Sequence, residues 1–182
     1  MASHGLTMRR LILLSCLLMS LSAPLMGQRS RDPLSDEETD QVREVADRPV
    51  ERIKLYMKFI ELRVAAMKQL NTDLKAQGRV VRFRNTLDEF TRLVDELAEN
   101  LDTYDDRHSD VRKALKDLVP ATQKWLDVLN APPQDAANDF ARKTALDAAQ
   151  SIHEQSKKLQ DDQDKYFAEH KDEKGKNGTG PS

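Results

Sequence analysis

The stretch LDTYDDRHSD, residues 101–110, distinguishes a compact bundle from a long rod, because it interrupts a long helical pattern without a glycine or a proline. Apolar residues recur every three or four positions from Val80 to Leu129, and they keep one register on both sides of the stretch. Such spacing predicts amphipathic helix. Residues 80–130 therefore form either one long helix, typical of an elongated coiled coil, or two helices that meet near residue 108.

The composition of the stretch favours two helices. Its threonine, aspartate, histidine and serine residues are weak helix formers. Ser109 is a suitable N-cap residue, and Asp110 would place a favourable negative charge in the first turn of a following helix. We therefore expect one helix to end near His108 and the next to begin at Ser109, although the apolar register runs on through His108.

The N-terminal half of the chain carries further helix signals. Ser35 and Glu38 have the spacing of a capping box, which predicts a short helix that ends before Pro49. Proline is favoured in a first helical turn, so Pro49 is expected to open a second, longer helix. The apolar stripe of this second helix reaches Leu74, and Gly78 is the expected end of the helix.

The C-terminal part predicts one more helix. The segment NAPPQ, residues 130–134, is typical of a linker because of its two prolines. An alanine-rich helix is expected to begin near Asp135. Its expected inward residues are Phe140, Thr144, Ala148, Ile152 and Leu159.

These elements predict an all-α fold, an up-down helical bundle of about four long helices with a short N-terminal helix. We expect a flexible segment over 28–34, a single bundle domain over 35–170 and a disordered tail over 171–182, where the composition is polar and glycine-rich.

The first residues of the chain predict export. Arg9 and Arg10 precede the uncharged run LILLSCLLMSL, residues 11–21, and a small-residue exit follows it. The run is too short for a membrane span, which needs about 20 apolar residues. We therefore expect residues 1–27 to be a cleaved signal peptide and the mature protein to be periplasmic or extracellular, without a stable membrane span. A retained anchor is the alternative.

Composition narrows the classes of function. Removal of residues 1–27 would leave 155 residues with a formal net charge of −4 and no cysteine, since Cys16 is the only one. A chain without cysteine has no disulfides, thiolate metal sites or cysteine nucleophile. Mild acidity argues against nucleic-acid binding and gives no reason to expect attraction to anionic lipid.

The acids and histidine of the central stretch raise the question of a metal site. Asp105 and His108 lie three positions apart and could reach one ion from a helix. A closed site needs three or four ligands, however, and the Glu-x-x-His pairs of di-metal bundles do not occur in this chain. The stretch is therefore interpreted as a helix boundary, and no metal or other cofactor is expected.

Haem or metal binding remains the alternative for the other histidines. His153 borders the expected core, and His170 lies where the last helix meets the tail. Either could be a ligand with Met57 or Met67 opposite, as in exported four-helix cytochromes. The similarity to those proteins is one of architecture alone, and methionines at stripe spacing are typical of a core.

The segment RVVRFR, residues 79–84, is the best candidate for an interaction surface. Val81 falls off the inward stripe and stands among Arg79, Arg82 and Arg84. Apolar residues and arginine are typical of interface cores. The alternative is that Val81 faces the short first helix.

The remaining sequence offers no catalytic motif. It contains no glycine-rich phosphate loop and no Gly-x-Ser-x-Gly elbow. We therefore expect an exported, non-catalytic binding or structural protein of the cell envelope, with a protein partner or self-association and without nucleic acid. A cofactor-binding bundle, with His153 or His108 as ligand, and an oligomeric coiled coil are the alternatives.

Overall fold

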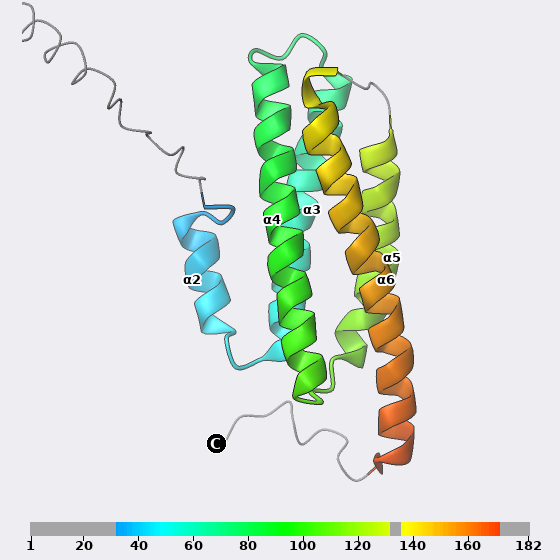
Figure 1. Ribbon diagram of the computed structural model, residues 1–182. Helices are drawn as coiled ribbons and strands as arrows, with labels where there is room; N and C mark the ends of the chain where they lie inside the picture. Colours follow the sequence, from blue (N-terminus) through cyan, green and yellow to red (C-terminus); the bar gives the residue numbers. More distant parts are fainter. Residues whose placement is uncertain (1–31, 132–135, 172–182) are drawn as a thin grey trace, which may run out of the picture. The chain divides into compact units, whose positions relative to one another are not determined.

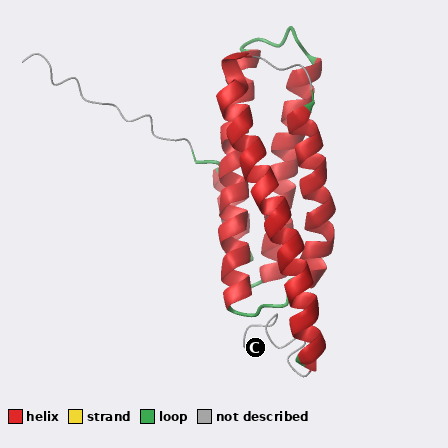
Figure 2. Ribbon diagram, turned by 45° about the vertical axis from the view of Figure 1, so that its right-hand side comes forward, coloured by secondary structure: helices red, strands yellow, loops and turns green. Residues whose placement is uncertain are grey.

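The computed structural model describes residues 32–131 and 136–171, and within these ranges the chain is helical with no strand. The elements are α2 (Asp36–Glu44), α3 (Pro49–Thr72), α4 (Arg79–Asp106), α5 (Arg112–Asn130), the 3₁₀ turn η1 (Ala136–Asn138) and α6 (Asp139–Glu169). The four long helices pack together and alternate in direction along the chain (Figures 1 and 2). The predicted all-α, up-down bundle with a short N-terminal helix is confirmed.

The four long helices occupy the corners of a bundle in an order that differs from their order in the chain. Neighbouring pairs are α3 with α4, α4 with α6, α6 with α5, and α5 with α3. Helices α4 and α5 are consecutive in sequence, yet they lie on a diagonal. The turn between them therefore crosses the end of the bundle, and α4 runs parallel to α6 beside it.

The core fills the space between all four long helices. Ile60 of α3, Leu97 of α4, Leu115 of α5 and Ile152 of α6 are completely buried. Aromatic rings bridge the α4–α5 diagonal, where Phe90 meets Trp125 edge to face with ring centroids 6.1 Å apart. Such pairs stabilise a core beyond the area that they bury.

Residues 107–111 separate α4 from α5, so the predicted break is confirmed and a single helix over residues 80–130 is wrong. His108 has φ of 50°, its N–H donates to the Asp105 carbonyl, and the Ser109 N–H donates to the Tyr104 carbonyl, both at 2.9 Å. These are the two hydrogen bonds of a Schellman motif, which ends a helix. His108, expected inside by its register, is exposed because it occupies this left-handed position.

The start of α5 differs from the prediction. Val111 is the N-cap residue and makes no side-chain cap, whereas Ser109 is buried. Gln163 of α6 supplies the missing partners: its Nε2 donates to the Ser109 carbonyl at 2.9 Å, and its Oε1 accepts from the Val111 N–H at 3.1 Å. A cap from another helix thus replaces the local cap that the sequence indicated.

Helix α3 ends earlier than expected. It stops at Thr72, and Asp73 accepts a hydrogen bond from the Lys75 N–H at 3.2 Å, a local turn that competes with helix. Gly78, with φ of 64°, is the residue before α4 and does not end α3. Leu74 therefore lies in the turn with 62% of its surface exposed, although its register predicted a core position.

The buried face of α6 also differs from the prediction in its first turns. Phe140 is 81% exposed, Thr144 is exposed and Ala148 is half-buried. The buried residues are instead Ala141, Ala145 and Ala149, followed by the expected Ile152 and Leu159. Alanines stand on both sides of this segment, so apolar spacing does not distinguish the two faces, and the small side chains let α6 approach its neighbours.

Several expectations lie wholly or mainly outside the described residues, including the signal peptide over 1–27 and the tail over 171–182. Of the segment predicted to be flexible, residues 32–34 are described, and Pro33 is buried. None of the described helices has the length and apolar character needed to cross a membrane.

Candidate functional site

One end of the bundle gathers apolar side chains on its surface. The α3–α4 turn, the start of α4 and the start of α6 all lie at this end (Figure 1). Five large apolar residues are exposed in the part of the chain that the structure describes, and four of them lie here. These four are Leu74 (62% exposed), Val80 (39%), Val81 (62%) and Phe140 (81%), and together with their basic neighbours they are named the end patch.

The fifth exposed apolar residue provides a contrast. Leu62, 53% exposed, stands in the middle of α3, away from the other four. Single exposed apolar residues are normal on a protein surface, whereas a group of them is typical of an interaction surface. The grouping, and not the exposure of any one residue, distinguishes the end patch.

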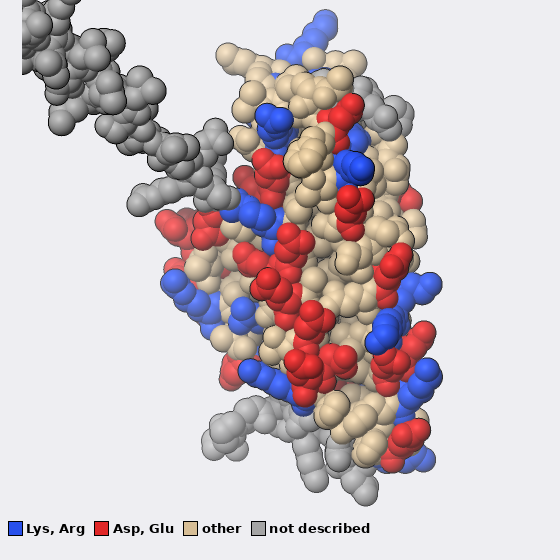
Figure 3. All heavy atoms as spheres, in the orientation of Figure 1, with Lys and Arg blue, Asp and Glu red and all other residues tan. Residues whose placement is uncertain are grey.

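Basic side chains surround the apolar ones at this end. Residues 68–84 contain five basic residues and one acid, Asp73, in a chain whose formal net charge is −2. The basic residues are Lys68, Lys75, Arg79, Arg82 and Arg84, and all except the half-buried Arg79 are exposed. Figure 3 shows basic side chains among uncharged atoms at this end, with some acidic ones beside them, while acidic side chains are more numerous along the middle and lower part of the same face.

A buried arginine holds the elements of the end patch together. Arg142 of α6 is 5% exposed, and its guanidinium lies over the ring of the buried Phe83 of α4, 5.0 Å from the centroid. Its Nη1 donates to the carbonyls of Leu129 at 2.7 Å and Ala131 at 3.2 Å, at the end of α5. The side chain therefore joins α4, α5 and α6 and satisfies carbonyls that a helix end leaves free.

The exposed surface includes more residues than were predicted from RVVRFR, residues 79–84. Val81, Arg82 and Arg84 are exposed, and Val81 does not face α2, since α2 packs against α3. Leu74, Val80 and Phe140, which sequence reasoning placed in the core, join Val81 at the surface. No sequence signal marked Arg142, because its role depends on carbonyls and a ring from two other helices.

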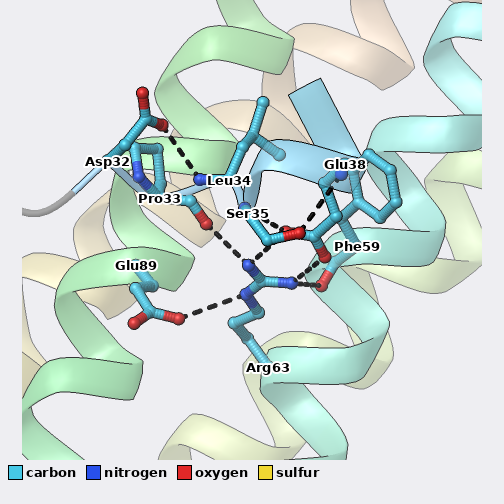
Figure 4. Close-up of polar contacts among 8 residues, drawn as sticks. All are labelled: Asp32, Pro33, Leu34, Ser35, Glu38, Phe59, Arg63 and Glu89. Atoms are coloured by element: carbon cyan, nitrogen blue, oxygen red, sulfur yellow. Dashed lines mark hydrogen bonds and ion pairs between the residues drawn. The ribbon is translucent and has the colours of Figure 1, made fainter. Parts of the chain in front are cut away.

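A second polar cluster attaches α2 to the bundle (Figure 4). Arg63 of α3 donates from Nη2 to Glu38 Oε2 at 2.7 Å and to the Pro33 carbonyl at 2.6 Å, and its Nη1 also pairs with Glu38. Arg63 Nε reaches Glu89 of α4 at 3.3 Å. The predicted capping box is present as well, with Ser35 and Glu38 exchanging hydrogen bonds. We name this cluster the α2 clasp.

The electrostatics of the α2 clasp favour its charged form. Burial raises the pKa of Glu38, but the hydrogen bonds from Arg63 and the Ser35 N–H, together with the positive charge of Arg63, outweigh it and leave this pKa below its ordinary value. The pKa of Arg63 is raised, chiefly by its hydrogen bond to Glu38. Both groups are therefore ionised at neutral pH, and the cluster is suited to fastening α2 rather than to transferring protons.

The opposite end of the bundle holds the histidine of the central stretch. His108 stacks on Tyr166 with ring centroids 4.5 Å apart, and Tyr166 stacks on His170 at 4.3 Å. A pocket of about 190 Å³ beside the stack is lined by Asp105, His108, Asp162, Gln163, Tyr166 and Phe167. Within the described ranges, no three acidic, histidine or cysteine side chains are placed to hold a metal ion.

The ligands suggested for a haem have other partners in the fold. His153 is half-buried, and its Nδ1 lies 2.8 Å from the Thr122 hydroxyl, which itself donates to the Val119 carbonyl. The Thr122 hydroxyl and His153 Nδ1 are therefore hydrogen-bonded to each other between α5 and α6. Met57 and Met67 are buried on α3, which lies on the diagonal from α6.

The end patch carries exposed groups of two kinds. Aliphatic and aromatic side chains lie beside guanidinium and ammonium groups, a combination that is common in interaction surfaces. No protein-family model, no curated protein and no solved structure matches the chain.

Proposed function

We propose that this chain is an exported, non-catalytic helical-bundle protein of the cell envelope that binds a partner through the end patch. One observation carries the proposal: four of the five large apolar side chains that are exposed in the described residues lie at one end of the bundle, beside a group of basic side chains. A group of this kind is typical of an interaction site.

The fold supports this role, because the end patch rests on a well-connected platform. Arg142 joins the three helices beneath it, and Phe83 is 2% exposed directly under the guanidinium. A surface that is already ordered loses less conformational entropy when it binds. Burial of Phe140 or Leu74 by a partner would be favourable by roughly 1.5–3 kcal/mol for each side chain that is fully covered.

The sequence supports the remaining parts of the proposal. The basic and apolar composition of residues 1–27 is typical of a secretory signal, and the chain contains no catalytic motif. The formal net charge of −2 disfavours nucleic acid as the partner.

The proposal can be tested with three full-length chains in a Gram-negative host. Wild-type protein should be recovered outside the cytoplasm and retained with the envelope fraction. The double variant V81S/F140S should be released into the soluble exported fraction, whereas the control L62S should behave like wild type, because Leu62 is exposed away from the end patch. Equal retention of all three chains, or wild-type protein confined to the cytoplasm, would contradict the proposal.

A further inference from the structure

The formal charge of the described residues is unevenly distributed. Residues 68–84 carry a net charge of +4, and the other described residues, 32–67, 85–131 and 136–171, together carry −9. The α3–α4 turn that contains many of these basic residues lies at one end of the four long helices (Figure 1). A negatively charged surface would attract this end and repel the rest, and it would therefore orient the molecule as it approached.

The apolar side chains of the end patch project from turns and helix starts. Leu74 lies in the α3–α4 turn, Val81 in the first turn of α4 and Phe140 in the first turn of α6. Three pockets lie toward the opposite end. One is lined by residues of 46–49 and 104–109, and the other two are lined by residues of 101–108 and 155–167. Projecting side chains need a partner that can admit them, and the headgroup region of a bilayer does so without a preformed pocket.

Basic side chains lie close in sequence to the projecting apolar ones. Lys75 follows Leu74, Arg82 follows Val81, and the exposed Lys143 lies one turn after Phe140. Exposed acids, Asp73 and Asp139, directly precede Leu74 and Phe140, so the excess of basic residues is greatest at Val81. Long basic side chains can extend toward phosphates while an apolar neighbour enters the less polar layer beneath. The spacing therefore suits a surface whose outer layer is anionic and whose inner layer is apolar.

A second copy of this chain fits the end patch less well. A two-fold contact would place the same patch on both copies, so the basic residues of 68–84 would face each other. A head-to-tail contact would bring the patch to the α4–α5 end, where the described residues include no large exposed apolar side chain. The projecting apolar groups would then remain without an apolar partner.

We propose that the end patch docks on an anionic phospholipid surface, with Leu74, Val81 and Phe140 among the headgroups and the basic residues of 68–84 against the phosphates. This inference rests on the proposed function and names the partner of the same surface. The mild acidity of the whole chain gave no reason to expect lipid attraction, but the structure concentrates positive charge and exposed apolar groups at one end.

Vesicle sedimentation tests the proposal. Full-length protein should sediment with vesicles of phosphatidylcholine mixed with phosphatidylglycerol, less so with phosphatidylcholine alone, and less at high salt. Each charge removed near the surface should weaken binding about fivefold, so R82Q/R84Q should lose about 25-fold. F140S should lose about tenfold through its apolar contact, and L62S should bind as wild type.

Residues 11–21 are apolar and could themselves bind lipid, so a position-specific measurement accompanies sedimentation. In F140W, a new tryptophan occupies the most exposed apolar position, while Trp125 is 1% exposed. Brominated phosphatidylglycerol should quench the added fluorescence of F140W and leave the Trp125 fluorescence of wild type unchanged.

The outcomes separate the two proposals. Binding that is independent of the end-patch variants, or no quenching in F140W, would overturn the lipid inference. If envelope retention still depends on Val81 and Phe140 while vesicles fail to bind, the partner is a protein and the proposed function stands. Self-association without lipid that the same variants abolish would also overturn the lipid inference. If neither vesicle binding nor envelope retention depends on the patch, both proposals fail.

Discussion

The two ends of this bundle contain similar elements, but apolar side chains are buried at one end and exposed at the other. Each end contains a turn between long helices and one end of α6 (Figure 1). At the α4–α5 end, Val111 is fully buried and Phe167 is 2% exposed, while at the other end Val81 and Phe140 are 62% and 81% exposed.

Helix α6 accounts for the covering of the α4–α5 end. It is 31 residues long and extends past the α4–α5 turn, where Gln163 bonds to the backbone of Ser109 and Val111 within the turn and Arg112 lies over the ring of Phe167. Its first turn does not cover the α3–α4 turn in the same way, because Phe140 points outward. Coverage by a neighbouring helix therefore accompanies the burial of the apolar residues at one end, and its absence accompanies their exposure at the other.

The largest effect on stability is expected from removing the Gln163 cap at the α4–α5 end. In Q163L, the buried Ser109 carbonyl and Val111 N–H lose their partner, so the free energy of unfolding should fall by about 3 kcal/mol. Chemical denaturation followed by circular dichroism measures the change. Q150L, on the exposed face of the same helix, should differ from wild type by less than about 0.5 kcal/mol. Equal stability of Q163L and Q150L would contradict the role of Gln163.

A smaller effect is expected from loosening the platform beneath the end patch. R142M removes hydrogen bonds to the carbonyls of Leu129 and Ala131 while keeping an apolar stem over Phe83, so stability should fall by about 2 kcal/mol. K143M removes an exposed cation next to it and should leave unfolding within about 0.5 kcal/mol of wild type. If both variants unfold alike, Arg142 does not join the three helices.

Acid should loosen the α2 clasp and leave both ends of the bundle in place. The pKa of Glu38 is lowered in the fold, so its stabilising contribution is present above the unfolded pKa of about 4.3 and is lost as pH falls through the lower folded value. The hydrogen-exchange protection factors of the α2 amides, taken relative to the intrinsic exchange rate at each pH, should therefore fall at acid pH before those of α4. E38Q should lose about 1.5 kcal/mol of α2 protection at neutral pH, and most of the acid dependence with it. An acid response of α2 that is the same in E38Q would exclude Glu38 as its source.

The smallest effect concerns the strained residue of the α4–α5 turn. His108 holds φ of 50°, a conformation that disfavours any residue with a β-carbon. H108G and H108A both lose the stack on Tyr166, so their difference isolates the backbone. H108G should be more stable than H108A by about 1 kcal/mol in denaturation. The reverse order would show that the left-handed conformation is not maintained in solution.

Local sequence chemistry predicted much of the secondary structure. The capping box of Ser35 and Glu38, the opening of α3 at Pro49 and the break near His108 all depend on residues close together in the chain, and all three are present. Leu87, Leu97 and Leu115 belong to the apolar repeat that runs from Val80 to Leu129, and all three are buried, since helical register is a local property.

The candidate surface was only partly predictable. Val81 was singled out because it left the apolar stripe, but Leu74 and Phe140 matched a stripe and were placed in the core. Leu74 is exposed because α3 ends at Thr72, and Phe140 because the small face of alanines packs inward instead. Both outcomes depend on which face of a segment a neighbouring helix covers. The apolar spacing of a single sequence does not show which face that is.

The amphipathic helices and most of their ends follow from the amino-acid sequence, because periodicity, caps and breakers act over a few residues. The packing of the helices set the other features: α4 and α5 lie on a diagonal, Gln163 caps a turn 52 residues away, and Arg142 joins three helices. These features bring together groups that are distant in the chain. Their energies arise from burial and from partners that exist only once the helices have packed.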